Sequence, residues 1–311
     1  MANLTFLDKE KLHTGFGEEI KNPKSYQDIL QQAGLDWTVK VHPAYVDYNG
    51  TMIKVPNTNV VVRDQDQKAL GVVSAKYKIV NNDAAFSFTE SLFTDGSVEF
   101  IRGGSYRGGS STWLEAKVTT DYEILGDKTE CYIIFRNSHD GTGSVIAMIV
   151  PTRVACSNAL NLALQNAPRH WRCVHSGDPM AKISEAKKVL LAGTTYMDAL
   201  QAEAERLQQI KLTSVQVEQF INRLYPIDPD ATERIKNTKN EARANLLSVY
   251  NDKDDLANYG NTGYKFISAV ADYVDHADGK RNTTTASENR FMKVSYGSPV
   301  LDQAYKMVLN A

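Results

Sequence analysis

The segment TECYIIFRNSHDGTGSVIAMIVPTRV, residues 129–154, decides the fold class. It contains two apolar runs that are joined by a polar, glycine-containing stretch. Asp140-Gly141 within that stretch is a common hairpin turn. With residues 98–118 upstream, three strand-like segments follow one another, linked by glycine-rich or acidic turns, which predicts an antiparallel sheet.

Further strands are expected upstream of this segment. Residues 37–48, 52–64 and 69–80 alternate or run apolar between turn signals such as Asn49-Gly50, which is typical of a strand meander. Residues 81–96 are the exception, because Asn82 or Asp83 can cap a helix there. The apolar residues on one face of that helix are Ala85, Phe88, Leu92 and Phe93.

Helical patterns dominate downstream. Residues 155–167 are expected to form a helix, and the chain is mostly helical from Ile183 onward. Because strands come first and helices last, we predict an α+β protein: an antiparallel β-meander with packed helices, then a mostly helical C-terminal part. The expected divisions are a polar N-terminal arm with a short helix (1–36), an α+β core domain (37–180) and a helical domain (181–311).

The composition indicates a globular protein. The chain has 311 residues, of which 42% are hydrophobic, and a formal net charge of −2, so any basic surface must be local. Its three cysteines are typical of a reducing compartment rather than a disulfide framework. No apolar run is long enough for a membrane span, and the N-terminal residues lack an apolar signal core, so a bacterial cytoplasmic location is expected.

The motif RGGSYRGG, residues 102–109, is a candidate phosphate-binding loop. Paired glycines can present backbone N–H groups to a phosphate, and Arg102 and Arg107 could add charged hydrogen bonds. The sequence has no G-x-x-x-x-G-K-[ST] motif, so a nucleoside triphosphate loop is not predicted. The alternative is a plain hairpin tip.

Two histidine-containing stretches allow other chemistry. His139 and Asp140 lie in RNSHDGTGS, where a hairpin turn is favoured over a metal or general-base pair. His170, Cys173 and His175 lie in RHWRCVHSGD but lack a fourth zinc ligand. No metal and no cofactor are therefore predicted. In the second stretch, arginines flank Trp171, a pattern in which guanidinium groups hold phosphates and an aromatic ring stacks on a base.

A local excess of basic residues occurs where the sheet is expected to lead into a helix. Between residues 131 and 182 the basic residues outnumber Asp140 and Asp178, in a chain that is otherwise slightly acidic. The basic residues of this seam are Arg136, Arg153, Arg169, Arg172 and Lys182. In VPTRVACSNALNLAL (150–164), Ser157 and Asn158 could cap the helix and, with Arg153, meet a phosphate. A solvated basic face remains the alternative.

Several segments between residues 70 and 295 resemble a known family. LGVVSAKYKIVNNDAAFSF, RNSHDGTGS, VPTRVACSNAL, HWRCVHSGD and GYKFISAVADYVDH are similar, in order and spacing, to phage/plasmid-like proteins grouped under a domain of unknown function. The element order and basic seam are also remotely similar to single-strand annealing proteins of the Redβ/RecT/recombination-mediator superfamily. That resemblance implies an ATP-independent oligomer, a ring or filament, that anneals complementary DNA strands in homologous recombination. A phage exonuclease or host single-strand-binding protein is the implied partner.

Three functional hypotheses remain open at this stage. The first is single-stranded DNA binding and annealing through Arg102, Arg107, Arg136, Arg153, Ser157, Asn158, Arg169, Trp171, Arg172 and Lys182. The second is an accessory or regulatory protein of a mobile element that acts through protein contacts. The third is a metal-dependent hydrolase around His139, Asp140 and His175. No catalytic residue is predicted, because the sequence carries no enzyme signature.

Overall fold

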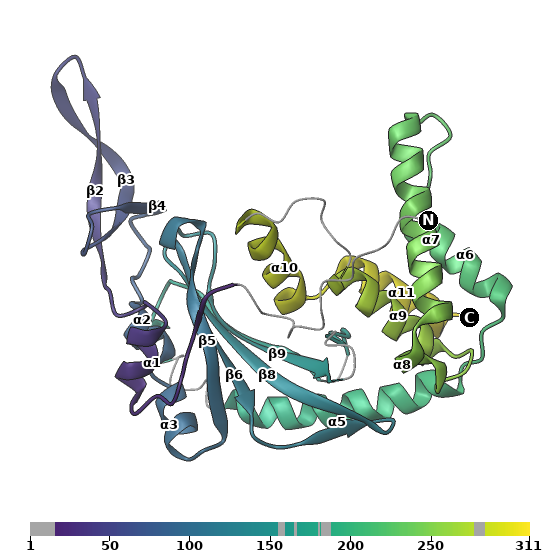
Figure 1. The fold of residues 1–311 in the computed structure, drawn as a ribbon. Coiled ribbons are helices and arrows are strands. Elements are labelled where there is room, and N and C mark those ends of the chain that lie inside the picture. Colours follow the sequence, from purple (N-terminus) through teal and green to yellow (C-terminus); the bar gives the residue numbers. More distant parts are fainter. Residues whose placement is uncertain (1–15, 155–158, 165–166, 180, 182–187, 277–283) are drawn as a thin grey trace.

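The larger sheet forms the centre of the molecule. The computed structural model describes residues 16–154, 159–164, 167–179, 181, 188–276 and 284–311 (Figure 1). The sheet has strand order β1-β5-β6-β8-β9-β10, with β7 paired to β8, and all pairings are antiparallel. Its strands are β1 (Glu18–Glu19), β5 (Val98–Tyr106), β6 (Ser111–Val118), β7 (Tyr122–Ile124), β8 (Asp127–Ser138), β9 (Val145–Arg153) and β10 (His170–Cys173). The predicted antiparallel core is confirmed.

Both faces of this sheet are buried. Side chains alternate along each strand, so each strand contributes to both faces. In β8, Cys131, Ile133 and Phe135 belong to one apolar cluster, and Tyr132 and Ile134 belong to another. We call these the first and second faces. The sheet thus separates two cores, which explains why the runs in residues 129–154 are almost continuously apolar.

Different helices cover the two faces. The first face packs against α1 (Tyr26–Gln32), α2 (Asn82–Phe86), α3 (Thr89–Thr94) and α5 (Lys188–Gln209). The second face is covered by α10 (Thr284–Tyr296), from which Phe291 packs on Trp113 with ring centroids 4.3 Å apart. Phe16 stacks on the same tryptophan at 5.4 Å. A C-terminal helix therefore contacts the sheet directly, and the domain boundary near residue 180 stays a prediction.

The N-terminal arm contributes to this packing. Its predicted helix is confirmed as α1: the Ser25 side chain caps it by accepting from Asp28 N, and Gly34 follows it with φ of 64°. The predicted helical segment 81–96 is also confirmed, divided between α2 and α3.

A smaller sheet forms a ribbon that projects from the body (Figure 1). It consists of β2 (Val39–Tyr48), β3 (Thr51–Arg63) and β4 (Ala69–Ser74). Asn49 and Gly50 both have positive φ (52° and 81°), as the predicted two-residue hairpin turn requires. The base of the ribbon has its own core around Trp37, Val61 and Val73. Its tip has no such core.

The C-terminal part is helical, as predicted. Its elements after α5 are α6 (Ser214–Leu224), α7 (Glu233–Asp252), α8 (Asp254–Ala257), α9 (Gly263–His276), α10 and α11 (Pro299–Leu309). Helix α9 is buried over most of its length and lies among α5, α7 and α11, so it is the centre of this part. Within the described residues, no helix is both long and apolar enough to span a membrane.

The helix predicted over residues 155–167 is wrong where the structure describes the chain. Ala159 forms an isolated bridge with Thr152, and residues 160–164 are not helical. The Tyr196 hydroxyl donates to the carbonyls of Leu160 (3.3 Å) and Leu162 (2.9 Å). Because these tertiary partners take up backbone acceptors, a non-helical path replaces the helix that local propensity favours.

Candidate nucleic-acid interface

The sequence pattern suggests that Arg153 could meet a phosphate, but the structure buries this side chain inside the protein. It is the last residue of β9, and its side chain is 0% exposed. Its Nε donates to Asp127 Oδ2 (2.8 Å), and Nη2 donates to the same oxygen and to the Tyr259 hydroxyl. Asp255 adds an ion pair at 3.8 Å. A buried guanidinium needs such partners, and these fasten the sheet to the helical part.

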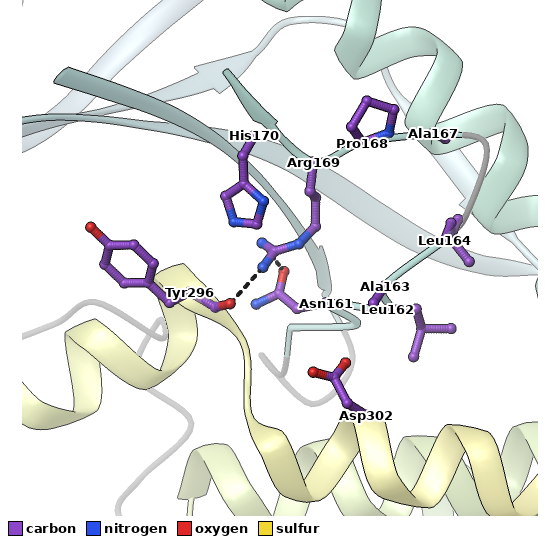
Figure 2. A pocket seen from close by; sticks show the side chains of 10 residues that line it. All are labelled: Asn161, Leu162, Ala163, Leu164, Ala167, Pro168, Arg169, His170, Tyr296 and Asp302. Carbon is purple, nitrogen blue, oxygen red and sulfur yellow. Dashed lines mark hydrogen bonds between the residues drawn. The ribbon is translucent and has the colours of Figure 1, made fainter. Parts of the chain in front are cut away.

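Arg136 and Arg169 are also buried and hydrogen-bonded. Arg136 donates to the Ser111 hydroxyl (3.2 Å) and to the Tyr296 hydroxyl on α10. Arg169 donates to the carbonyls of Ile149, Ser295 and Tyr296 and to Asn161 Oδ1 (Figure 2). Burial lowers the pKa of the Arg169 guanidinium. These three seam arginines are therefore turned inward, where they join elements of the fold.

The remaining seam residues differ in their surroundings. Trp171 is half-buried in the core of the first face, with its ring 6.2 Å from Phe88. Arg172 is exposed, and its Nε donates to the Ser144 hydroxyl at 2.8 Å. Ser157, Asn158 and Lys182 lie outside the described residues. The structure thus brings no continuous row of exposed arginines together along the described part of this seam.

The RGGSYRGG motif is divided between a strand and a turn. Arg102 lies in β5, and its Nη2 donates to the Gly17 carbonyl at 3.2 Å, which holds the N-terminal strand. Arg107, Gly108 and Gly109 form the turn between β5 and β6, with φ of 52°, 68° and 96°. Such a left-handed run favours glycine. The Arg107 side chain is exposed at this turn.

Two further cations lie over the same turn. A Cβ on Gly108 would be 2.9 Å from Lys68 Nζ, and one on Gly109 would be 2.6 Å from Arg63 Nη1. Asp66 accepts from Arg63 Nε (2.8 Å) and Nη2 (2.5 Å), so Nη1 is the end directed at the glycine. We call this group, Arg63, Lys68 and Arg107–Gly109, the cationic turn. Because these glycines have no side chain, two cationic groups can lie close to their backbone, which is exposed at Gly108 and buried at Gly109.

Carboxylates lie near this group as well. The hydrogen bonds from Arg63 lower the pKa of Asp66 to about 2. Glu288 on α10 accepts from the Arg107 backbone N at 3.5 Å, and Asp140 accepts from the Ser110 hydroxyl at 3.2 Å. Lys68 and Arg107 form no ion pair with any described carboxylate. They are thus the cations of this turn best placed to meet an external anion.

Sequence reasoning missed Arg63 and Lys68. Both flank the polar stretch DQDQK, which reads only as a turn between strands. Nothing in that spacing indicates that the β3–β4 connection packs against the β5–β6 turn, some forty residues further on. Their positions depend on how the ribbon is seated on the larger sheet.

The ribbon tip exposes apolar and aromatic side chains. These are Tyr45, Val46, Tyr48, Met52 and Ile53, of which Tyr48 is the most exposed at 67%. Tyr45 lies directly opposite Lys54 in the register, so an aromatic ring and an ammonium share one face. Residues 39–63 hold Lys40, Lys54 and Arg63 against Asp47, a net charge of +2 in a chain of net charge −2.

The histidine candidates have structural partners. His139 Nε2 lies 2.9 Å from Asn82 Oδ1, and burial lowers the pKa of His139 to about 3. Burial raises the pKa of Asp140, but hydrogen bonds from Ser138 and Thr142 outweigh this, and the net shift is downward. His175 faces the Lys78 carbonyl at 3.2 Å, with a pKa that burial lowers.

These environments do not make a metal centre. Among the described residues, no three His, Cys, Asp or Glu side chains are grouped so that they could hold a metal ion. His170 is exposed at the sheet edge whereas Cys173 is buried, as strand alternation predicts. The three histidines share lowered pKa values, so neutral imidazoles are the dominant form at pH 7.

The fold and the candidate site together define an α+β protein that carries a projecting ribbon and a cationic glycine turn. Residues 69–294, from the start of β4 into α10, match a family described as a domain of unknown function, DUF932. The chain belongs to this family, which agrees with that part of the resemblance seen in the sequence. Searches of curated proteins and of solved structures found no match.

Proposed function

We propose that this protein binds single-stranded DNA through the cationic turn and the ribbon, and that it anneals complementary strands as an oligomer without ATP. The observation that carries the proposal is the approach of Lys68 and Arg63 to Gly108 and Gly109, next to exposed Arg107. Lysine and arginine side chains beside unhindered backbone are a common phosphate-binding arrangement.

The ribbon supports the same proposal. Residues 39–74 of the ribbon carry a net charge of +1, with Lys40, Lys54, Arg63 and Lys68 as the cations, and exposed Tyr45 and Tyr48 offer rings on which bases can stack. Proline at positions 43 and 56 removes backbone donors from β2 and β3, which disfavours pairing with a foreign strand edge. Contacts through side-chain faces are therefore favoured at this ribbon.

Salt-dependent binding tests the phosphate contacts. The affinity of the full-length protein for a fluorescent oligothymidine should fall with rising salt, and Lys68→Ala and Arg107→Ala should each lower that slope by about one unit. Matched controls are Lys211→Ala and Arg223→Ala, exposed residues of the helical part. If the first pair behaves like the controls, the cationic turn does not bind phosphate.

Assembly and annealing need their own measurement. Each protomer offers a short binding surface, so an annealing protein requires several protomers along one strand. Electron micrographs of the protein, with and without single-stranded DNA, should show rings or filaments. When complementary strands are mixed without ATP, the protein should accelerate duplex formation. If the protein stays monomeric in the presence of DNA, annealing is contradicted. If it binds no DNA but self-associates through the ribbon, the alternative of an accessory protein that acts through protein contacts is favoured.

A further inference from the structure

A cavity of about 250 Å³ lies between residues 161–164 and 167–170 on one side and the junction of α10 with α11 on the other (Figure 2). This volume is below the usual range for drug-sized ligands, roughly 300–1,000 Å³, so its occupant must be small. Its lining combines one buried cation, one carboxylate and an apolar wall. None of the residues in the cationic turn lines it.

Arg169 provides the cationic side of the cavity. Its side chain is buried, and its described hydrogen bonds run to three carbonyls and one side-chain amide, all of them neutral. Nη2 uses one hydrogen, on the Tyr296 carbonyl at 2.9 Å. Its second hydrogen and Nε–H make no hydrogen bond to any described residue, so the guanidinium keeps donors for an acceptor in the cavity.

Asp302 provides the opposite side, from the first turn of α11. Its carboxylate accepts no hydrogen bond from the described residues and forms no direct ion pair with Arg169, although each charge acts on the other. Figure 2 shows this carboxylate directed toward the Arg169–Asn161 group across the cavity. A ligand between them must offer an acceptor to the guanidinium and a donor to the carboxylate.

The rest of the lining is partly apolar. Leu162, Leu164, Ala167 and Pro168 supply apolar surface beside the polar pair. His170 also lines the cavity, and partial burial of its ring together with the neighbouring Arg169 charge lowers its pKa to about 4, so it adds no charge at pH 7. Apolar walls with a donor and an acceptor at the edge match a nucleobase.

We propose that this cavity binds one unstacked nucleobase, and that guanine fits it best. Guanine offers two adjacent N–H groups to the Asp302 carboxylate and its O6 to Arg169, whereas adenine has no carbonyl oxygen for the guanidinium. The inference rests on the proposed DNA binding, with the base supplied by the bound strand. Free guanosine carries the same chemistry and is the other source.

Helix α10 connects this cavity to the cationic turn. Glu288 contacts the Arg107 backbone, and Tyr296, eight residues later, contacts Arg169. At 1.5 Å per residue the two positions are about 12 Å apart along the helix axis, a distance that a few nucleotides can cover. This spacing is within the reach of one bound strand.

Titration with free nucleosides tests the cavity apart from any DNA. Guanosine should shift NMR signals of the full-length protein and bind more tightly than adenosine by about tenfold or more, the discrimination of one bidentate contact. Asp302→Asn, which keeps the side-chain shape, should remove that preference. Ala163→Leu adds bulk to the cavity wall at an exposed position and should weaken the binding of both nucleosides. If guanosine causes no shift, or if it binds both variants as it binds the unaltered protein, the proposal is overturned.

Oligonucleotides separate this inference from the proposed function. An oligothymidine with one central guanine should bind about tenfold more tightly than oligothymidine alone, and Asp302→Asn should abolish the difference while leaving oligothymidine affinity unchanged. Equal affinity for the two oligonucleotides, with a normal salt slope, would overturn the base pocket and leave DNA binding intact. Guanosine binding without oligonucleotide binding would support the base pocket and overturn DNA binding.

Discussion

The seam arginines and the cationic turn use the same chemistry in opposite surroundings. Arg136 and Arg153 are buried, and their described hydrogen bonds run to protein oxygens. Lys68 and Arg107 are exposed beside glycine backbone. A local excess of basic residues in the sequence therefore does not locate a basic surface. Strand alternation and tertiary partners decide whether a guanidinium stabilises the fold or meets an external anion.

Replacing Arg153 should give the largest effect. Arg153→Met leaves Asp127 and Asp255 beside a buried apolar side chain, and removing one partner of a buried ion pair costs about 3–5 kcal/mol. Urea unfolding measures this loss, and Arg172→Met serves as the exposed control. A loss below about 1 kcal/mol would show that the network contributes little to stability and would contradict the statement that the buried arginines stabilise the fold.

Trp171 tests the aromatic part of the same comparison. Trp171→Ala should lower the unfolding free energy by about 2 kcal/mol, less than for a fully buried tryptophan, because the ring is only half-buried against the first-face core. Its affinity for single-stranded DNA, corrected for folded fraction, should not change. An affinity loss of about 1–3 kcal/mol in a variant of normal stability would instead indicate base stacking.

The sequence predicted the fold better than the site, for a physical reason. Hydrophobic periodicity is local, so residues 129–154 were sufficient to predict antiparallel strands. In the same way, the dipeptide Asn49-Gly50 was sufficient to predict the hairpin turn of the ribbon. The segment after Arg153 has helical periodicity, yet its described residues are not helical and the Tyr196 hydroxyl donates to their carbonyls. Such long-range partners leave no mark in a short window of sequence.

The site required information of that long-range kind. Arg107 was a candidate from its glycine-rich motif, and the structure leaves it exposed. Lys68 joins it only because the β3–β4 connection packs beside the β5–β6 turn, and Asp302 shares a cavity with Arg169 only because the first turn of α11 lies near that arginine. No spacing rule links these pairs, which come from distant parts of the chain.

Asp275 extends the comparison to a buried acid. Burial raises its pKa from 3.8 to about 7; the hydrogen bond from the Ala159 backbone N lowers the pKa, the Asp272 charge raises it and the Lys293 charge lowers it. The folded state thus holds a proton that the unfolded state releases, so this group's contribution to stability falls as pH rises from about 4 to 7. It is constant above that range.

Asp275→Asn should remove this part of the pH dependence. Between pH 5 and 6 the unaltered protein should lose about 1 kcal/mol of unfolding free energy more than the variant, because one proton per molecule corresponds to roughly 1.4 kcal/mol per pH unit. Denaturant unfolding at several pH values measures the difference. Parallel pH profiles for the two proteins would contradict a raised pKa at this position.

Arg172 should give the smallest effect and the sharpest distinction, because it is the one described seam arginine that is exposed. It lies on the short edge strand β10, and its hydrogen bond to Ser144 is easily replaced by water. Arg172→Ala should therefore change the unfolding free energy by less than about 0.5 kcal/mol. Because the neighbouring seam arginines are turned inward, it should also leave the salt slope of DNA binding unchanged, whereas Arg107→Ala lowers that slope by about one unit. The reverse result, a lower salt slope for Arg172→Ala and an unchanged slope for Arg107→Ala, would place the phosphate contacts at the seam instead of the cationic turn.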